Sequence, residues 1–259
     1  FQFSQDGRRL AWTTSVKTGM ESGADGVSLT DLSNLRTTQL ISGPGNYRSL
    51  TFDESGESLG FISDRDTYEK KKPNYSVYYW KAGKGAPKAV ATEATNGITD
   101  GWEISPTSGI TFSKNGRRLF FNTAPHRDED EDPTEADDEE MPDEEKPVKV
   151  DIWHWQDPWL QPMQLLRAAQ ERNRTYRAVV DLKSGKVNQL ADPLVPQVTA
   201  GEEGNARFAL GVSDLPYRRS ISWDYPGRKD AYLVDLVTGK SETLLEGIDS
   251  NPSLSPQAQ

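Results

Sequence analysis

The chain has 259 residues, a formal net charge of −10 and no cysteine. A chain of this length can bury a sizeable core, but it mostly lacks the long helical periodicity of an α/β enzyme. The absence of cysteine excludes a disulfide framework and a thiolate metal site. No apolar run approaches the ~20 residues that a membrane helix needs. We therefore expect no membrane span.

The negative charge is concentrated in one segment. Between Asp128 and Glu145 there are 13 acidic residues and no Lys or Arg, which leaves 30 basic and 27 acidic residues elsewhere. Such a run repels itself, so residues 127–147 are expected to form a solvated, mobile loop. The alternative is a calcium site, but the run lacks the Asp-x-Asp-x-Asp-Gly pattern with a later Glu. We therefore expect no bound metal and no cofactor. We also expect no nucleic acid partner, because no basic stripe carries interleaved aromatic residues.

Three stretches of the chain carry nearly the same ten letters. They are FSQDGRRLAW from Phe3, FDESGESLGF from Phe52 and FSKNGRRLFF from Phe112. Each predicts two strands joined by a tight turn, in which an Asp-Gly or Asn-Gly pair supplies the positive backbone angles of a two-residue hairpin. The copies start 49 and 60 residues apart, which is near the length of one four-stranded propeller blade.

The repeat continues in weaker form. Residues 204–211 match its turn and second strand, and residues 252–256 resemble the start of another copy. A second hairpin follows the repeats, with strands expected at 76–80, 176–182 and 231–236, the last two followed by Ser-Gly-Lys or Thr-Gly-Lys. Two hairpins per unit make four strands. We therefore predict an all-β chain in which residues 1–259 form a β-propeller segment, with about four blades of a larger, incomplete ring.

One interruption of the repeats, residues 148–175, is rich in tryptophan. At its start, Val148, Val150, Ile152 and His154 alternate with Lys149, Asp151, Trp153 and Trp155, which predicts an edge or inner strand. A helix is expected near 158–174, with Pro162 in its first turn. Their spacing places Met163, Leu166, Ala169 and Gln170 on one face of this helix.

The tryptophans of this interruption allow two interpretations. Trp153, Trp155 and Trp159 supply apolar area to a core or to contacts between blades. Alternatively, the aromatic and acidic cluster projects from the propeller and contacts a ligand or a neighbouring domain. The candidate residues for that contact are Trp153, His154, Trp155, Asp157 and Trp159.

Residues 56–60 match the G-x-S-x-G motif of a nucleophile elbow. A nucleophile elbow needs a strand that turns sharply into a helix. Here Ser58 falls inside the second repeat, where it aligns with Arg9 and Arg118 of the sister copies. The two histidines, His126 and His154, have no second ligand or base at useful spacing. We therefore predict no catalytic residue in this chain.

The repeats resemble a known family. The F-S-x-D-G-R-x-L-A-W pattern, the Ser-Asp-Arg at 63–65 and the Val-Asp-Leu hairpins look like the N-terminal β-propeller of the prolyl oligopeptidase family of serine peptidases. Residues 148–180 are similar to an insertion found in a bacterial subgroup of that family. The blade signature is shared with TolB-like propellers.

The resemblance implies a non-catalytic propeller that gates or positions peptide substrate for a C-terminal α/β-hydrolase domain with a Ser-Asp-His triad. It also implies a periplasmic or secreted location. Dipeptidyl members use a Glu pair on a propeller helix to hold the substrate amine, and residues 151–160 contain no Glu. The alternative is a TolB-like or scaffold propeller that acts through protein–protein contact.

Overall fold

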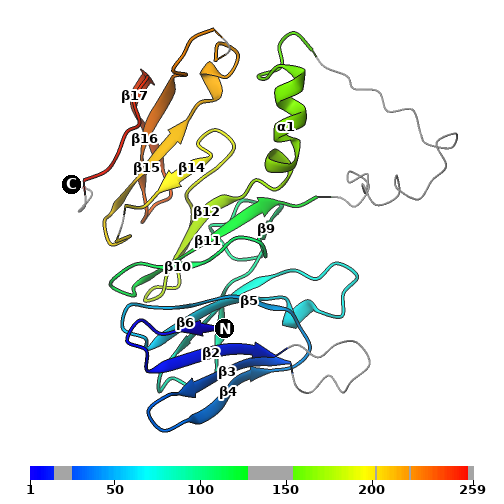
Figure 1. The fold of residues 1–259 in the computed structure, drawn as a ribbon, viewed down its shortest axis with the longest axis vertical. Helices are drawn as coiled ribbons and strands as arrows, with labels where there is room; N and C mark the ends of the chain where they lie inside the picture. The colour runs from blue at the N-terminus through cyan, green and yellow to red at the C-terminus, as the bar shows by residue number, and fades with distance from the viewer. Residues whose placement is uncertain (15–24, 128–153, 202, 222, 256–259) are drawn as a thin grey trace, which may run out of the picture.

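The computed structural model of the chain describes residues 1–14, 25–127, 154–201, 203–221 and 223–255. These residues form four antiparallel sheets that follow one another along the chain (Figure 1). Strands that are consecutive in sequence are neighbours within each sheet, except in the third sheet, where the first two strands both pair with the third strand. Each sheet is therefore one propeller blade, and the predicted all-β propeller architecture is confirmed.

The blades are defined by their strands. Blade 1 contains β1 (Gln2–Phe3), β2 (Arg9–Thr14), β3 (Gly26–Asp31) and β4 (Arg36–Ser42). Blade 2 contains β5 (Tyr47–Phe52), β6 (Ser58–Ser63), β7 (Ser76–Lys81) and β8 (Lys88–Ala91). Blade 3 contains β9 (Trp102–Ile104), β10 (Thr111–Phe112), β11 (Arg118–Pro125), β12 (Tyr176–Asp181) and β13 (Val187–Gln189), with β9 and β10 both paired to β11. Blade 4 contains β14 (Gln197–Thr199), β15 (Phe208–Ser213), β16 (Lys229–Asp235) and β17 (Ser241–Ile248).

The turn of the repeat differs from the predicted two-residue hairpin. Ser4 N–H donates to the Arg9 carbonyl at 2.9 Å, so four residues lie between the last paired positions. Gly7 has a positive φ of 68°. The carboxylate of Asp6 accepts hydrogen bonds from the Ser4 hydroxyl and the Arg8 N–H. The predicted two-residue hairpin was wrong, because the side chain of Asp6 closes a longer loop by hydrogen bonding.

The hydrophobic core lies between successive blades. Strand alternation sends Leu119 and Phe121 toward blade 2, where they join a cluster with Ile62 and Val77. Phe120 points the other way, into the cluster shared with blade 4. A third cluster joins blades 1 and 2. Each sheet is thus covered on the faces that meet a neighbouring blade, which explains why its strands are apolar at consecutive positions.

Arginine side chains of the repeat hold neighbouring blades together. Arg118 of blade 3 donates to the carbonyls of Gly204, at 3.1 Å, and Ala206 in blade 4. Arg9 of blade 1 donates in the same way to the Gly56 carbonyl of blade 2. The repeat position of these arginines therefore has a structural function at two of the three blade junctions.

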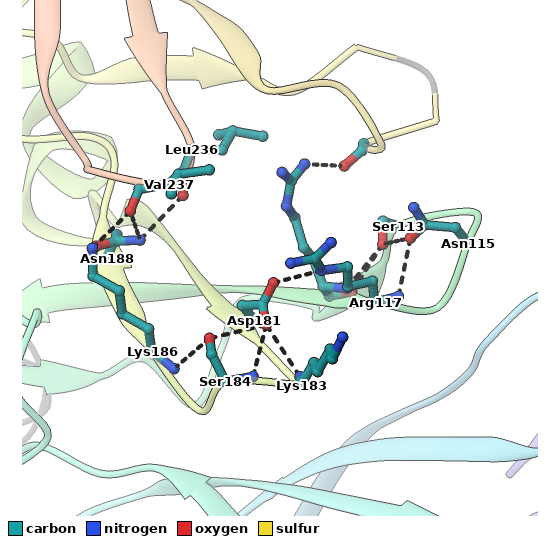
Figure 2. Close-up of polar contacts among 12 residues, drawn as sticks. Ser113, Asn115, Arg117, Asp181, Lys183, Ser184, Lys186, Asn188, Leu236 and Val237 are labelled. Carbon is teal, nitrogen blue, oxygen red and sulfur yellow. Dashed lines mark hydrogen bonds and ion pairs between the residues drawn. The ribbon is translucent and has the colours of Figure 1, made fainter.

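Blades 3 and 4 have a further polar junction (Figure 2). The Asn188 amide is 8% exposed and donates to the carbonyls of Leu236 and Val237, both at 3.1 Å. Lys186 Nζ also donates to the Val237 carbonyl, at 2.8 Å. These contacts fix the hairpin of blade 4 against the last strand of blade 3.

We expect Arg118→Ala to lower the free energy of unfolding by about 1–3 kcal/mol, because it leaves two half-buried carbonyls without their donor. The adjacent Arg117 is the matched control. Its guanidinium forms a surface ion pair with Asp181 at 2.8 Å, so Arg117→Ala should cost less than about 1 kcal/mol. Urea unfolding of both variants measures the difference, and equal losses would contradict the inter-blade function of Arg118.

The connections between second and third strands lie at one rim of the blades, because the blades share one meander topology. The β11–β12 connection contains α1 (Gln161–Arg172), and the β15–β16 connection contains the short 3₁₀ helix η5 (Leu215–Tyr217). α1 stands beside the β15–β16 connection (Figure 1). None of the helices in the described ranges is both long and apolar enough to span a membrane.

Candidate functional site

A cavity of about 490 Å³ lies between the start of α1 and the β15–β16 connection. We call it the Trp–Arg pocket. From the α1 side it is lined by His154, Trp155, Asp157, Pro158, Trp159 and Leu160, together with Met163 and Arg167. From the other side it is lined by Arg218, Arg219, Ile221 and Trp223. The structure thus brings together four of the five sequence-predicted contact residues, and Trp153 lies outside the described residues.

The segment before α1 is a turn held by Asp157. Asp157 Oδ2 accepts the backbone N–H of His154 at 2.8 Å and Nε2 of Gln164 at 3.0 Å. These two hydrogen bonds, the first being the stronger influence, lower the pKa of Asp157. The carboxylate therefore ties the turn to the helix. Of the strand predicted from residues 148–155, the described residues His154 and Trp155 lie in this turn, because Asp157 accepts the His154 N–H. The rest of that predicted strand lies outside the described residues.

Trp159 forms the floor of the pocket between two arginines. The Arg167 guanidinium carbon lies 4.1 Å from the centre of its ring, and that of Arg218 lies 5.3 Å away. The indole is 8% exposed. Its Nε1 has no hydrogen-bond partner in the part of the chain that the structure describes. Trp159 is therefore packed, yet it retains an unsatisfied donor.

The other tryptophans of the pocket are open to solvent. Trp155 is 72% exposed and Trp223 is 76% exposed. The guanidinium carbon of Arg219 lies 5.5 Å from the centre of the Trp155 ring. Large exposed aromatic side chains grouped around one cavity are unusual unless they contact something. Trp155 thus belongs to the surface of the pocket, whereas Trp159 belongs to its interior.

The charge of the pocket is positive although the chain as a whole is acidic. Arg167, Arg218 and Arg219 line it against a single acidic lining residue, Asp157. Arg218 is neutralised by Asp214, whose Oδ1 lies 2.8 Å from its Nε. Arg167 and Arg219 form no ion pair with any other described residue. The side chains that line the pocket therefore carry a net positive charge.

The helix α1 packs through mostly polar positions. Leu165 and Leu166 are 58% and 79% exposed, and of the face shared by Met163, Leu166, Ala169 and Gln170 only Met163 is half-buried. The half-buried positions are mostly polar, at Gln161, Met163, Gln164, Arg167, Ala168 and Glu171. One of these polar positions, Glu171, accepts a hydrogen bond from Arg174 at 2.7 Å, and this contact lowers the pKa of Glu171. The predicted position of Pro162 in the first turn is confirmed.

The G-x-S-x-G motif occupies a hairpin and the start of a strand. Ser58 lies on β6 and is 3% exposed, with its hydroxyl 3.2 Å from the Tyr79 hydroxyl. His126 is elsewhere, with Nδ1 3.0 Å from Glu103 Oε2. Within the described ranges, no three His, Asp or Glu side chains gather in a way that could hold a metal. The acidic segment 128–147 and its calcium alternative lie outside the described residues.

Eight of the twelve residues that line the pocket were not among the predicted contact residues. Four of these eight carry a guanidinium or an indole group. They are Arg167, Arg218, Arg219 and Trp223. Three of these belong to the β15–β16 connection, where the letters YRRSISW interrupt the fourth repeat. The sequence did contain one signal for this site. Two adjacent arginines are followed by a tryptophan between two strands of the blade. Nothing in the sequence alone placed that segment beside α1.

No protein-family model and no curated protein matches the chain. Among solved structures, it is similar to dipeptidyl peptidase 4 from Porphyromonas gingivalis, with a TM-score of 0.50 and 11% identity over 95% of this chain and 32% of that one. The β-propeller domain of the Trilobed protease from Pyrococcus furiosus gives 0.48 and 12%, over 93% and 55%. TolB from Acinetobacter baumannii gives 0.40 and 14%, over 95% and 43%. The chain thus spans less than two thirds of each, and the likeness to the dipeptidyl peptidase supports the propeller fold alone.

Proposed function

We propose that the chain is a non-catalytic propeller that gates or positions peptide substrate for a C-terminal α/β-hydrolase serine peptidase domain. The observation that carries the proposal is the Trp–Arg pocket, which opens at the rim where connections of blades 3 and 4 meet. The resemblance of the repeats to the propellers of serine peptidases supports it, and the likeness to a solved dipeptidyl peptidase supports only the fold that the proposal requires. A periplasmic or secreted location is part of the same proposal.

The pocket has the chemistry that peptide binding requires. Exposed indoles at Trp155 and Trp223 offer flat apolar surface with little conformational entropy to lose. The exposed guanidinium group of Arg219 supplies donors for backbone carbonyls or carboxylates. A cavity of about 490 Å³ is within the usual range of small-ligand pockets and suits a few residues of a peptide.

The proposal is tested on the protein encoded by the whole reading frame. We expect that frame to contain a strand–turn–helix G-x-S-x-G and the protein to react with a fluorophosphonate probe, whereas the 259-residue chain alone stays unlabelled. Trp223→Ala should change kcat/KM for peptides and leave hydrolysis of a small ester unchanged. Leu35→Ala, an equally exposed position on blade 1, is the control.

Two results would contradict the proposal. One is labelling of the isolated chain that disappears on Ser58→Ala, which would make the hairpin serine a nucleophile. The other is a reading frame without any hydrolase domain, which would favour the alternative, a TolB-like or scaffold propeller that acts through protein–protein contact.

A further inference from the structure

We propose that the Trp–Arg pocket recognises a carboxylate carried beside an apolar group, with Arg219 as the residue that contacts the carboxylate. The proposal rests on the proposed function in taking the ligand to be a peptide. Two sources of this chemistry are possible in a peptide, the free C-terminus and an Asp or Glu side chain. Peptides that carry only one of these two carboxylates distinguish between the sources.

Arg219 is the cation of the pocket that is available to a ligand. Arg218 has a side chain that is 10% exposed and is neutralised by Asp214. The guanidinium carbon of Arg167 lies over the buried Trp159 ring, 4.1 Å from its centre. Arg219 is exposed, forms no ion pair with the described residues, and lies over the Trp155 ring at 5.5 Å. A guanidinium supported on an indole presents its forked donors to a planar carboxylate.

Trp159 provides an independent indication of a ligand oxygen. Its indole N–H is buried and has no acceptor among the described residues, although buried donors are nearly always paired. Trp159 lines the same cavity as Arg219. A bound group with acceptor oxygens would satisfy this donor after a small movement of the atoms that cover it, whereas a purely apolar or cationic group would not.

The remaining surface of the pocket is apolar. Trp155 and Trp223 are largely exposed, and Leu160 is 58% exposed. Ile221 and Met163 extend this surface across the cavity. The one lining carboxylate, Asp157, already accepts two hydrogen bonds from the protein. The ligand that fits is therefore anionic at one end and apolar or aromatic next to it, rather than an amine.

Binding to the 259-residue chain is measured by isothermal titration with three peptides of one aromatic-rich sequence. The first has a free C-terminal carboxylate, the second is amidated, and the third is amidated but carries one internal Glu. N-acetylphenylalanine and its amide serve as small probes. We expect at least tenfold tighter binding of one or both carboxylate-bearing peptides than of the neutral amide, and weaker binding at high salt.

Variants assign the effect to Arg219. Arg219→Gln should abolish the preference for the carboxylate and leave binding of the neutral amide unchanged, with an unchanged melting temperature. Arg219→Lys should restore part of the preference, because it keeps the charge and loses the fork. Arg36→Gln, an exposed arginine on blade 1, is the control and should change nothing.

The outcomes separate the two proposals. If acid and amide peptides bind equally well, or if Arg219→Gln has no effect, the carboxylate inference is overturned while peptide binding stands. If N-acetylphenylalanine binds through Arg219 but no peptide binds, the inference holds for the pocket and the proposed function fails. If nothing binds, both fail.

Discussion

Replacing Gly97 with alanine is expected to lower the free energy of unfolding by about 3–5 kcal/mol. Gly97 lies in the segment between blades 2 and 3, and its carbonyl accepts the Gln189 N–H of β13 at 2.7 Å. Its φ is +102°, and a Cβ there would lie 1.9 Å from the Val187 carbonyl oxygen. Because the atom in the way is backbone, relief requires this segment to move off the edge of blade 3.

Gly101 is the matched control for Gly97. It has a positive φ of 76°, but a Cβ there meets nothing within 4 Å. Gly101→Ala should therefore cost only about 1 kcal/mol, from backbone strain alone. Urea unfolding followed by circular dichroism gives both values. If the two variants were equally stable, the connecting segment would not be docked on β13.

Truncation of Phe121 to alanine is expected to cost about 3–5 kcal/mol. Phe121 is 1% exposed and belongs to the cluster that joins blades 2 and 3. Its removal leaves a cavity between two stacked sheets, whose strands cannot close the gap without breaking their register. Phe1, which is 85% exposed, is the control, and Phe1→Ala should change stability by less than about 0.5 kcal/mol.

Thermal unfolding of these two phenylalanine variants checks the stacking of the blades. A large loss for Phe121→Ala and none for Phe1→Ala supports a core located between the sheets. Similar melting temperatures for both variants would show that blades 2 and 3 are not packed on each other as described.

The repeats allowed most of the fold to be predicted, because a blade is a local unit. The letters from Phe112 to Phe121 place β10 and the first part of β11, and the Val-Asp-Leu hairpins place β12 and β16. The fourth copy was harder to align. Thr199 pairs with Leu210, whereas the equivalent Thr111 pairs with Phe120, so the fourth loop is two residues longer.

The site was predicted on one side only. Trp155, Asp157 and Trp159 were identified because they are concentrated in one unusual segment of the sequence. Arg218 and Arg219 were missed because their position beside α1 depends on the packing of blade 4 against blade 3. That packing depends on contacts distant in sequence, such as Arg118 with Gly204, which a single sequence does not reveal.

Photocrosslinking of a peptide to the 259-residue chain tests most directly whether the Trp–Arg pocket binds peptide. A peptide with a benzophenone side chain beside its C-terminal carboxylate is irradiated with the protein, and the products are mapped by mass spectrometry after digestion. We expect crosslinks within residues 154–163 and 218–223, competed by unlabelled peptide and reduced in Arg219→Gln. Crosslinks confined to the hairpins at the opposite rim, such as residues 113–118 and 183–186, would contradict peptide binding in the Trp–Arg pocket.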